Sequence, residues 1–294
     1  MHRKILRLGA LAIVIPVTLI MAACASSTVS LPPITASPSG EHRFGVFVWH
    51  DLLTTEPDAA KRFYGGLFDW TFEDVEVGQR GVYTVIYHGG KPIGGIVDAR
   101  QFSSPVNVSQ WIPVLSVSDV DAAVAATLAA GGRTFADPVD VDGRGRMAVI
   151  GDPQGAIITL LRSVSGDPRY DDLSPGGFIW NEIWTADIQG ALDFYGRLGG
   201  YNVSMTSLRE GEPYHYIAQA TVPVAGVLQT PFEGLRTSWV SYVGVRDVEA
   251  AVSKVAGLGG KVIVDTVETV GSSDAAAIVD PSGAGLMLQT WPLR

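Results

Sequence analysis

The chain has 294 residues, 47% of them hydrophobic and 17% charged, and its formal net charge is −9. Such a length allows one large domain or two ordinary ones. The acidic balance argues against nucleic acid as a partner and against electrostatic attraction to anionic lipid, and the single cysteine excludes an intramolecular disulfide.

The N-terminal residues have the layout of an export signal. Arg3, Lys4 and Arg7 form a basic start, an uncharged apolar run follows, and small residues precede Cys24. The apolar run is short for a membrane span of roughly 20 residues. This arrangement resembles a bacterial lipoprotein signal. The resemblance implies removal of residues 1–23 and an exported protein held at the periplasmic or extracytoplasmic membrane face by lipid on Cys24. The alternative is a retained N-terminal anchor helix.

The residues after this signal are rich in Ser, Pro and Thr. Residues 24–43 have no apolar period, so we expect a lipid-anchored flexible tether there. The globular part is expected to start near Phe44.

The globular part contains an internal repeat. FVWHDLLTTEPDAAKRFYGGLFDW at 47–70 matches FIWNEIWTADIQGALDFYGRLGGY at 178–201, with an offset of 131. Two later pairs match with an offset of 128: SVSDVDAAVAATLAAGG with GVRDVEAAVSKVAGLGG, and GDPQGAIITLL with VDPSGAGLMLQ. A repeat of this length predicts two duplicated domains, 44–163 and 178–294, joined by a linker at 164–177.

Each copy is predicted to contain two strand–helix–strands units. The first unit begins with an apolar strand over about 45–53, which enters a helix over about 56–67. Thr55 is the expected cap of this helix, and Pro57 lies in its first turn. One helix face carries Ala60, Phe63, Tyr64 and Leu67, and strands are expected around 82–88 and 92–98.

The second unit begins with a strand over 111–117, followed by a helix over about 119–130. Gly131 and Gly132 are expected to end this helix. Its inner face is predicted to consist of Val120, Ala123, Val124 and Leu128.

The order of these pieces, found twice, resembles the vicinal-oxygen-chelate superfamily, which includes glyoxalases, bleomycin-resistance proteins and extradiol dioxygenases. The resemblance implies an α+β fold of tandem glyoxalase-like domains. Four βαβββ units would form two curved, cavity-enclosing mixed sheets with helices outside. In metal-using members, side chains on several strands hold a divalent ion in the cavity.

The positions that match the metal ligands of such members carry other residue types here. The resemblance assigns these positions to Trp49, Ile112 and Thr159 in the first domain, and to Trp180, Val240 and Met287 in the second. None of the six is His, Glu, Asp or Gln, whereas a divalent ion needs nitrogen or oxygen donors. We therefore predict no metal and no other cofactor. The alternative is a divalent metal held through unusual ligands, such as Asp51 or Glu182 with residues from the other half.

His50 and Asp51 are adjacent and invite a metal-site interpretation. Neighbours in a strand point to opposite faces, so Asp51 shares the face of Trp49, and His50 takes the other face. A metal site shared by His50 and Asp51 is not expected unless a bulge intervenes. We expect His50 to be half-buried beside the helix.

The other two histidines of the domains are expected at different kinds of position. His88 is placed at a strand end or turn, and His215 could line the second cavity with Tyr214 or Tyr216, but not with both.

Asp51 and Glu182 each follow a tryptophan by two residues and are predicted to face inward. An unpaired buried carboxylate costs several kcal/mol, so each needs a donor. Two interpretations stay open. They could anchor a polar or cationic group of a ligand beside an indole wall, or they could accept hydrogen bonds from the backbone of a loop.

The candidate cavity residues for ligand binding are Trp49, Asp51, Thr159, Trp180, Glu182, Tyr214 and Met287. We expect them to bind or sequester a small, mostly apolar molecule without a metal. One alternative is a metal-dependent lyase, isomerase or dioxygenase, and another is an envelope interaction module without a small ligand. Trp111 and Trp239 are expected in core or domain-interface packing instead.

Overall fold

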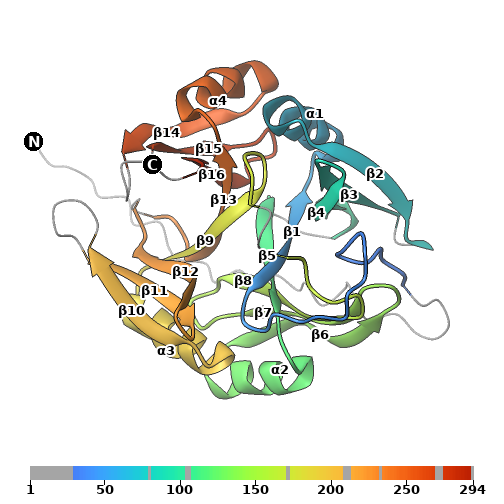
Figure 1. The fold of residues 1–294 in the computed structure, drawn as a ribbon, viewed down its shortest axis with the longest axis vertical. Helices are drawn as coiled ribbons and strands as arrows, with labels where there is room; N and C mark the ends of the chain where they lie inside the picture. Colours follow the sequence, from blue (N-terminus) through green and yellow to red (C-terminus); the bar gives the residue numbers. More distant parts are fainter. Residues whose placement is uncertain are drawn as a thin grey trace, which may run out of the picture.

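The computed structural model describes residues 29–78, 81–102, 107–169, 173–207, 213–231, 234–268 and 274–292. The first half, residues 47–163, forms one eight-stranded sheet, and the second half, residues 178–290, forms another (Figure 1). Each half contains two βαβββ units, so the α+β fold of four such units that the resemblance implied is confirmed.

The first sheet has the strand order β2-β3-β4-β1-β5-β8-β7-β6. Strand β1 pairs in parallel with β4 and antiparallel with β5, and β5 pairs in parallel with β8, so the two units join along β1 and β5. The elements are β1 (Phe47–Thr54), α1 (Pro57–Phe68), β2 (Thr71–Glu76), β3 (Val82–His88), β4 (Lys91–Asp98), η2 (Ala99–Gln101), β5 (Gln110–Ser116), α2 (Val120–Ala129), β6 (Arg133–Val141), β7 (Gly145–Gly151) and β8 (Ile157–Ser163).

The second sheet repeats this order as β10-β11-β12-β9-β13-β16-β15-β14. Its central strands are β9 and β13, which pair antiparallel. The elements are β9 (Phe178–Thr185), α3 (Ile188–Gly199), β10 (Asn202–Ser207), β11 (Pro213–Gln219), β12 (Val222–Gln229), β13 (Ser238–Val245), α4 (Val248–Val255), η5 (Ala256–Leu258), β14 (Lys261–Glu268), β15 (Asp274–Val279) and β16 (Gly285–Thr290).

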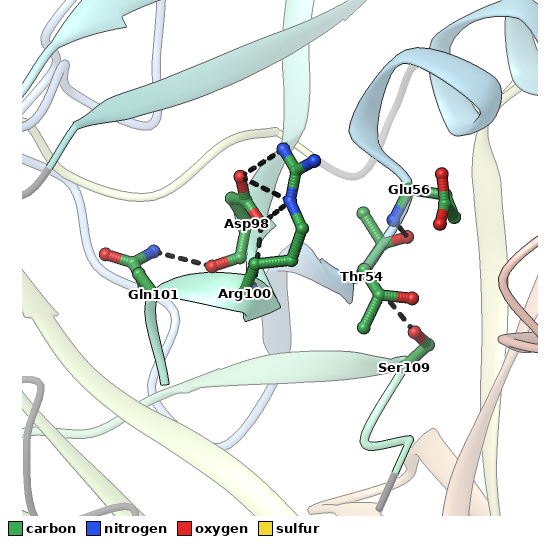
Figure 2. A network of polar contacts seen from close by, with 7 residues as sticks. Thr54, Glu56, Asp98, Arg100, Gln101 and Ser109 are labelled. Carbon is green, nitrogen blue, oxygen red and sulfur yellow. Dashed lines mark hydrogen bonds and ion pairs between the residues drawn. The ribbon is translucent and has the colours of Figure 1, made fainter. Parts of the chain in front are cut away.

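The start of α1 differs from the prediction. Glu56, not Thr55, is the N-cap residue, and its side chain makes no capping hydrogen bond. Instead, the Glu56 amide donates to Thr54 Oγ1 at 3.0 Å, and the Thr55 amide donates to Ser109 Oγ at 3.2 Å (Figure 2). The backbone of Thr55 is therefore hydrogen-bonded to Ser109, the residue that precedes β5. Beside this turn, Arg100 forms an ion pair with Asp98 at 2.6 Å (Figure 2).

The buried face of α2 also differs at one position. Leu128 is 54% exposed, and Thr127 is buried in its place with Oγ1 donating to the Ala123 carbonyl at 2.9 Å. Position 127 follows Val120 by seven residues, which is two helical turns, whereas position 128 is rotated further around the helix. The predicted inner face of α1 is confirmed, since all four of its residues are buried.

The two halves pack through the faces that carry their helices. Helices α1 and α4 lie together at one end of the molecule, and α2 and α3 lie together at the other (Figure 1). Two apolar clusters fill these ends, and each draws residues from both halves. Burial of such shared apolar surface is the main force holding the halves together.

Buried tyrosines connect the halves at equivalent places. The Tyr64 hydroxyl donates to Asp280 Oδ2 at 3.2 Å, and the Tyr195 hydroxyl donates to Asp152 Oδ2 at 3.1 Å. The Trp111 indole N–H donates to the Tyr64 hydroxyl at 2.9 Å. Trp239 makes the same bond to Tyr195, also at 2.9 Å. The prediction that Trp111 and Trp239 serve core and interface packing is confirmed.

The N-terminal segment, residues 29–43, packs on the first half. Leu31 N donates to the Asp142 carbonyl at 2.9 Å, and Ile34 is 0% exposed. Further along, Asp167 N donates to the Glu41 carbonyl at 2.7 Å. The expected flexible tether is therefore wrong for these residues, because a few apolar side chains in a polar segment suffice to bind an apolar sheet face. Residues 24–28 of the expected tether, the signal residues and Cys24 lie outside the described residues.

No helix in the described part of the chain has both the length and the apolar character needed to cross a bilayer.

Candidate ligand-binding site

The predicted candidate residues lie on the face of each sheet that is opposite its helices. We call this the helix-free face. Across β1 and β5 of the first sheet, Trp49 is paired with Val114 and Asp51 with Ile112, and across β5 and β8 Val114 is paired with Thr159. Paired residues in neighbouring strands point to the same side of a sheet. Trp49 and Asp51 therefore lie on one face, as the strand alternation predicted, and Thr159 lies on the same face.

Asp51 accepts two hydrogen bonds from aromatic side chains. Its Oδ1 atom accepts from the Tyr83 hydroxyl at 2.6 Å and from the Trp49 indole N–H at 3.0 Å. The indole N–H also lies 3.0 Å from the Tyr83 hydroxyl oxygen, to which it donates. The pKa of Tyr83 is raised, chiefly because the phenol is buried, so the hydroxyl stays protonated and able to donate. The donors are thus side chains of the same sheet, not loop amides.

The space above these residues is filled by the protein itself. Arg144 is 1% exposed, and its guanidinium carbon lies 4.7 Å from the ring centroid of Trp49 and 5.5 Å from that of Tyr83. Arg144 Nε donates to the Pro32 carbonyl at 2.8 Å. Ile34 belongs to the same apolar cluster as Trp49 and Tyr83. The helix-free face of the first half is therefore covered by Arg144, from the hairpin turn between β6 and β7, and by the N-terminal segment.

The second half places Glu182 inside a ring of aromatic donors. Its Oε1 atom accepts from the Tyr214 hydroxyl at 2.7 Å. Its Oε2 atom accepts from the Trp184 indole N–H at 3.1 Å and from the Tyr242 hydroxyl. The Trp180 indole N–H donates to the Tyr214 hydroxyl at 2.9 Å. Burial raises the pKa of Glu182, although these hydrogen bonds act in the opposite direction.

The aromatic residues of the second half are less covered than their counterparts. Trp49 is 1% and Tyr83 5% exposed, whereas Trp180 and Tyr214, which occupy the same repeat positions, are only half-buried. Met287 lies on the same face, since it is paired with Tyr242 across β13 and β16. This face offers aromatic and apolar side chains to a ligand around one buried carboxylate.

The residues do not fit a divalent metal. In the second sheet, Val240 is paired with Glu182, and Tyr242 is paired with both Trp180 and Met287. The three positions that the resemblance assigned to metal ligands in this half, Trp180, Val240 and Met287, therefore lie on the helix-free face. The described residues contain no group of three or more His, Cys, Asp or Glu that could hold a metal ion. Each inward carboxylate is instead surrounded by O–H and N–H groups that donate to it.

His50 lies on the opposite face from Asp51, as the alternation predicted, so the two do not share a site. The expectation that it is half-buried is wrong: it is 5% exposed and its ring stacks on Phe178 at 3.8 Å between centroids. Its Nε2 atom is hydrogen-bonded to Asn181 Oδ1 at 3.0 Å. Burial lowers the pKa of His50 to about 4, against a weaker opposing effect of the Asn181 bond. The second half supplies this cover, which no pattern within the first half reveals.

The other two histidines lie away from the carboxylates. His88 ends β3, and its Nε2 atom is 3.4 Å from Ser174 Oγ, which agrees with the predicted strand end. His215 is paired with Val227, which packs in the helix-side core, so it faces away from Glu182. Tyr214 and Tyr216 instead share the Glu182 side, because residues two apart in a strand point the same way. The expectation that His215 lines the second cavity with one of them is wrong.

Sequence reasoning missed several residues of this arrangement. Tyr83 and Trp184 had usable signals: Tyr83 matches Tyr214 at the repeat offset of 131, and Trp184 follows Glu182 by two residues in a strand. Arg144 and Ile34 had none, because a hairpin turn and a polar segment carry no period that points to a sheet face.

Comparisons with known proteins agree with this fold. Residues 48–161 match the family model of the glyoxalase-like domain. The protein named "Putative glyoxylase CFP32" of Mycobacterium bovis is 31% identical over 245 residues, which cover 83% of this chain and 94% of that protein. The anthracycline biosynthesis protein DnrV of Streptomyces peucetius is 31% identical over 255 residues, which cover 82% and 91%.

Two solved structures are similar in fold. The Mn(II)-bound glyoxalase from Novosphingobium aromaticivorans has a TM-score of 0.54 and 16% identity, covering 88% of this chain and 84% of its own. The 2,2',3-trihydroxybiphenyl 1,2-dioxygenase from Sphingomonas wittichii has a TM-score of 0.56 and 13% identity, covering 85% and 91%. At such identities the similarity concerns the fold alone.

Proposed function

This chain belongs to the glyoxalase-like family of the vicinal-oxygen-chelate superfamily, and within that family we propose that its second half binds a small, mostly apolar molecule without a metal. The observation that carries the proposal is the ring of Trp180, Trp184, Tyr214 and Tyr242 around Glu182, with Trp180 and Tyr214 still partly exposed. Pockets that bind small molecules combine apolar walls with a few placed polar groups. The role is to sequester or present the bound molecule.

The first half is not proposed as a second site. Its Trp49 and Asp51 belong to a matching network, but Arg144 and Ile34 cover them. We assign these two residues, with Thr159, a structural role. The functional interpretation is kept for Trp180, Glu182, Tyr214 and Met287.

Replacing Trp180 with alanine is expected to weaken the binding of a neutral aromatic probe, N-phenyl-1-naphthylamine, by about tenfold, which corresponds to ~1.4 kcal/mol. The half-buried indole is the accessible wall of the site, and its loss removes contact area. Probe fluorescence titration measures the affinity.

The matched control is Phe44→Ala, which removes an aromatic side chain that is 37% exposed outside the site and is expected to keep the affinity. Equal affinity of the wild type and the Trp180→Ala variant would contradict the proposed site. Stoichiometric Zn, Ni, Mn or Fe in the purified protein would instead favour a metal-dependent enzyme. A crosslinked protein partner that survives Trp180→Ala would favour an envelope interaction module.

We also propose that lipid on Cys24 holds the protein at the extracytoplasmic membrane face. The signal layout and the placement of the single cysteine support this. The Val29 carbonyl accepts a hydrogen bond from the Asp142 amide, between β6 and β7, at 3.0 Å, and Val29 follows Cys24 by five residues. Such a length spans at most about 18 Å, so the first half would stay close to the bilayer.

The Cys24→Ser variant is expected to move from the membrane fraction to the soluble fraction, because lipid attachment would be lost. Fractionation and the intact mass of the N-terminal fragment measure this. The control is Ser27→Ala, which leaves the cysteine in place. Membrane retention of Cys24→Ser equal to that of the control would show a retained anchor helix instead.

A further inference from the structure

The two halves place the same hydrogen-bonded trio on their helix-free faces. Trp49 corresponds to Trp180 and Tyr83 to Tyr214, each at the repeat offset of 131. In the first half the indole N–H donates to the tyrosine hydroxyl at 3.0 Å, and that hydroxyl donates to Asp51 at 2.6 Å. In the second half the same two bonds, with Glu182 as the final acceptor, measure 2.9 Å and 2.7 Å.

In the first half this trio receives a cation from the chain itself. The guanidinium of Arg144 lies over the Trp49 ring at 4.7 Å, and its Nη2 atom donates to the Tyr83 hydroxyl at 3.4 Å. A buried cation is costly unless aromatic faces, hydrogen bonds or an anion compensate it. The trio provides all three, since the Tyr83 hydroxyl connects the guanidinium to Asp51. The arrangement is therefore a built site for an organic cation.

In the second half the trio has an anion but only neutral hydrogen-bond partners. The described side chains that donate to Glu182 are tyrosines and tryptophans, and Glu182 is 5% exposed. The ring of Trp180, whose counterpart lies under Arg144, is half-buried rather than covered. Like Trp180, the partly buried apolar side chains of Ile179, Leu228 and Val240 pack against the buried cluster that contains Trp184, Tyr242 and Met287.

We infer that the second site binds a molecule that joins a guanidinium or ammonium group to an apolar body. The cation of this molecule lies over the ring of Trp180, as the guanidinium of Arg144 lies over the ring of Trp49. This inference rests on the proposed function, because it names the chemical class of ligand for the same site. The neighbouring apolar side chains receive the rest of the molecule, and Glu182 supplies the counter-charge.

The test uses two probes of nearly equal shape, benzylguanidine, which is a cation at pH 7.5, and benzylurea, which is neutral. Affinities for the full-length protein are measured by calorimetry and by tryptophan fluorescence at 150 mM salt, so that the general attraction of an acidic protein for cations is screened. Benzylguanidine is expected to bind the wild type at least about tenfold more tightly than benzylurea.

Two variants test whether the charge of Glu182 causes this preference for benzylguanidine. Glu182→Gln keeps the shape and removes the charge, and it is expected to reduce the preference to less than about threefold. Glu249→Gln removes one charge from an exposed position in the first turn of α4, and it is expected to keep the wild-type preference. Circular dichroism checks that both variants are folded.

The outcomes separate the inference from the proposed function. Equal affinity for the two probes, or a preference unchanged by Glu182→Gln, overturns the cation inference, while binding that still depends on Trp180 leaves the proposed function standing. Binding of neither probe, together with no binding of N-phenyl-1-naphthylamine, overturns both.

Discussion

Truncation of Ile34 to alanine is expected to lower the free energy of unfolding by about 2–5 kcal/mol. Ile34 is 0% exposed and belongs to a cluster with Trp49, Tyr83, Val114 and Leu161. The smaller side chain would leave a cavity on the helix-free face of the first sheet and admit water toward the buried charge of Arg144. Urea denaturation followed by tryptophan fluorescence measures the loss.

The control is the same substitution at Ile263, which is 51% exposed on β14. Ile263→Ala is expected to cost about 1 kcal/mol or less, because it removes little buried surface and changes only strand preference. If Ile34→Ala cost no more than Ile263→Ala, the N-terminal segment would not be part of the folded first half.

This result bears on function as well as on stability. A chain that began at residue 44 would lack Ile34 and the Pro32 carbonyl that holds Arg144 over Trp49, so the first half could bind probes that the intact protein excludes. Binding experiments on the second site therefore need the N-terminal segment in place.

Acidification from pH 7 to pH 4 is expected to remove roughly 3 kcal/mol of stability through His50 alone. Burial against Phe178 lowers the pKa of His50 from 6.5 to about 4 in the folded state. Between these two values the unfolded chain binds a proton that the folded chain does not. The contribution is therefore complete above pH 6.5 and is lost as the pH falls toward 4.

The measurement compares urea unfolding of the wild type and His50→Gln across this pH range. Glutamine keeps an amide donor for Asn181 Oδ1, and the variant is expected to lose less stability on acidification than the wild type. The His50 ring resonances in NMR spectra should not titrate above pH 5. A wild-type pH dependence that is preserved in His50→Gln, or a His50 titration near pH 6.5, would show that this imidazole is hydrated.

Strand periodicity predicts the face on which a side chain lies but not how deeply it is buried, as His50 and Asp51 show. Alternation alone separated the two side chains onto opposite faces, and the structure confirms it. The degree of burial could not be predicted in the same way. The cover of His50 comes from Phe178 and Asn181, more than 100 residues away.

The same distinction applies to the candidate site. The repeat and the strand period were enough to place Trp49 with Asp51 and Trp180 with Glu182, and the family resemblance implied that the metal-ligand positions carry other residue types. They could not show that the two carboxylates differ in their surroundings. Asp51 lies beneath Arg144, whereas Glu182 lies among tyrosines and tryptophans.

By itself, the sequence determined the duplication, the main helices and the opposite faces taken by His50 and Asp51, because these follow from the internal repeat and from local periodicity, and its family resemblance implied the α+β fold. Only the tertiary structure decided which of the two matching faces is covered. Arg144 comes from a hairpin and Ile34 from a polar segment, and both reach the face through contacts between residues far apart in the chain. The cover over each of these faces depends on such distant contacts, which no local pattern of residues encodes.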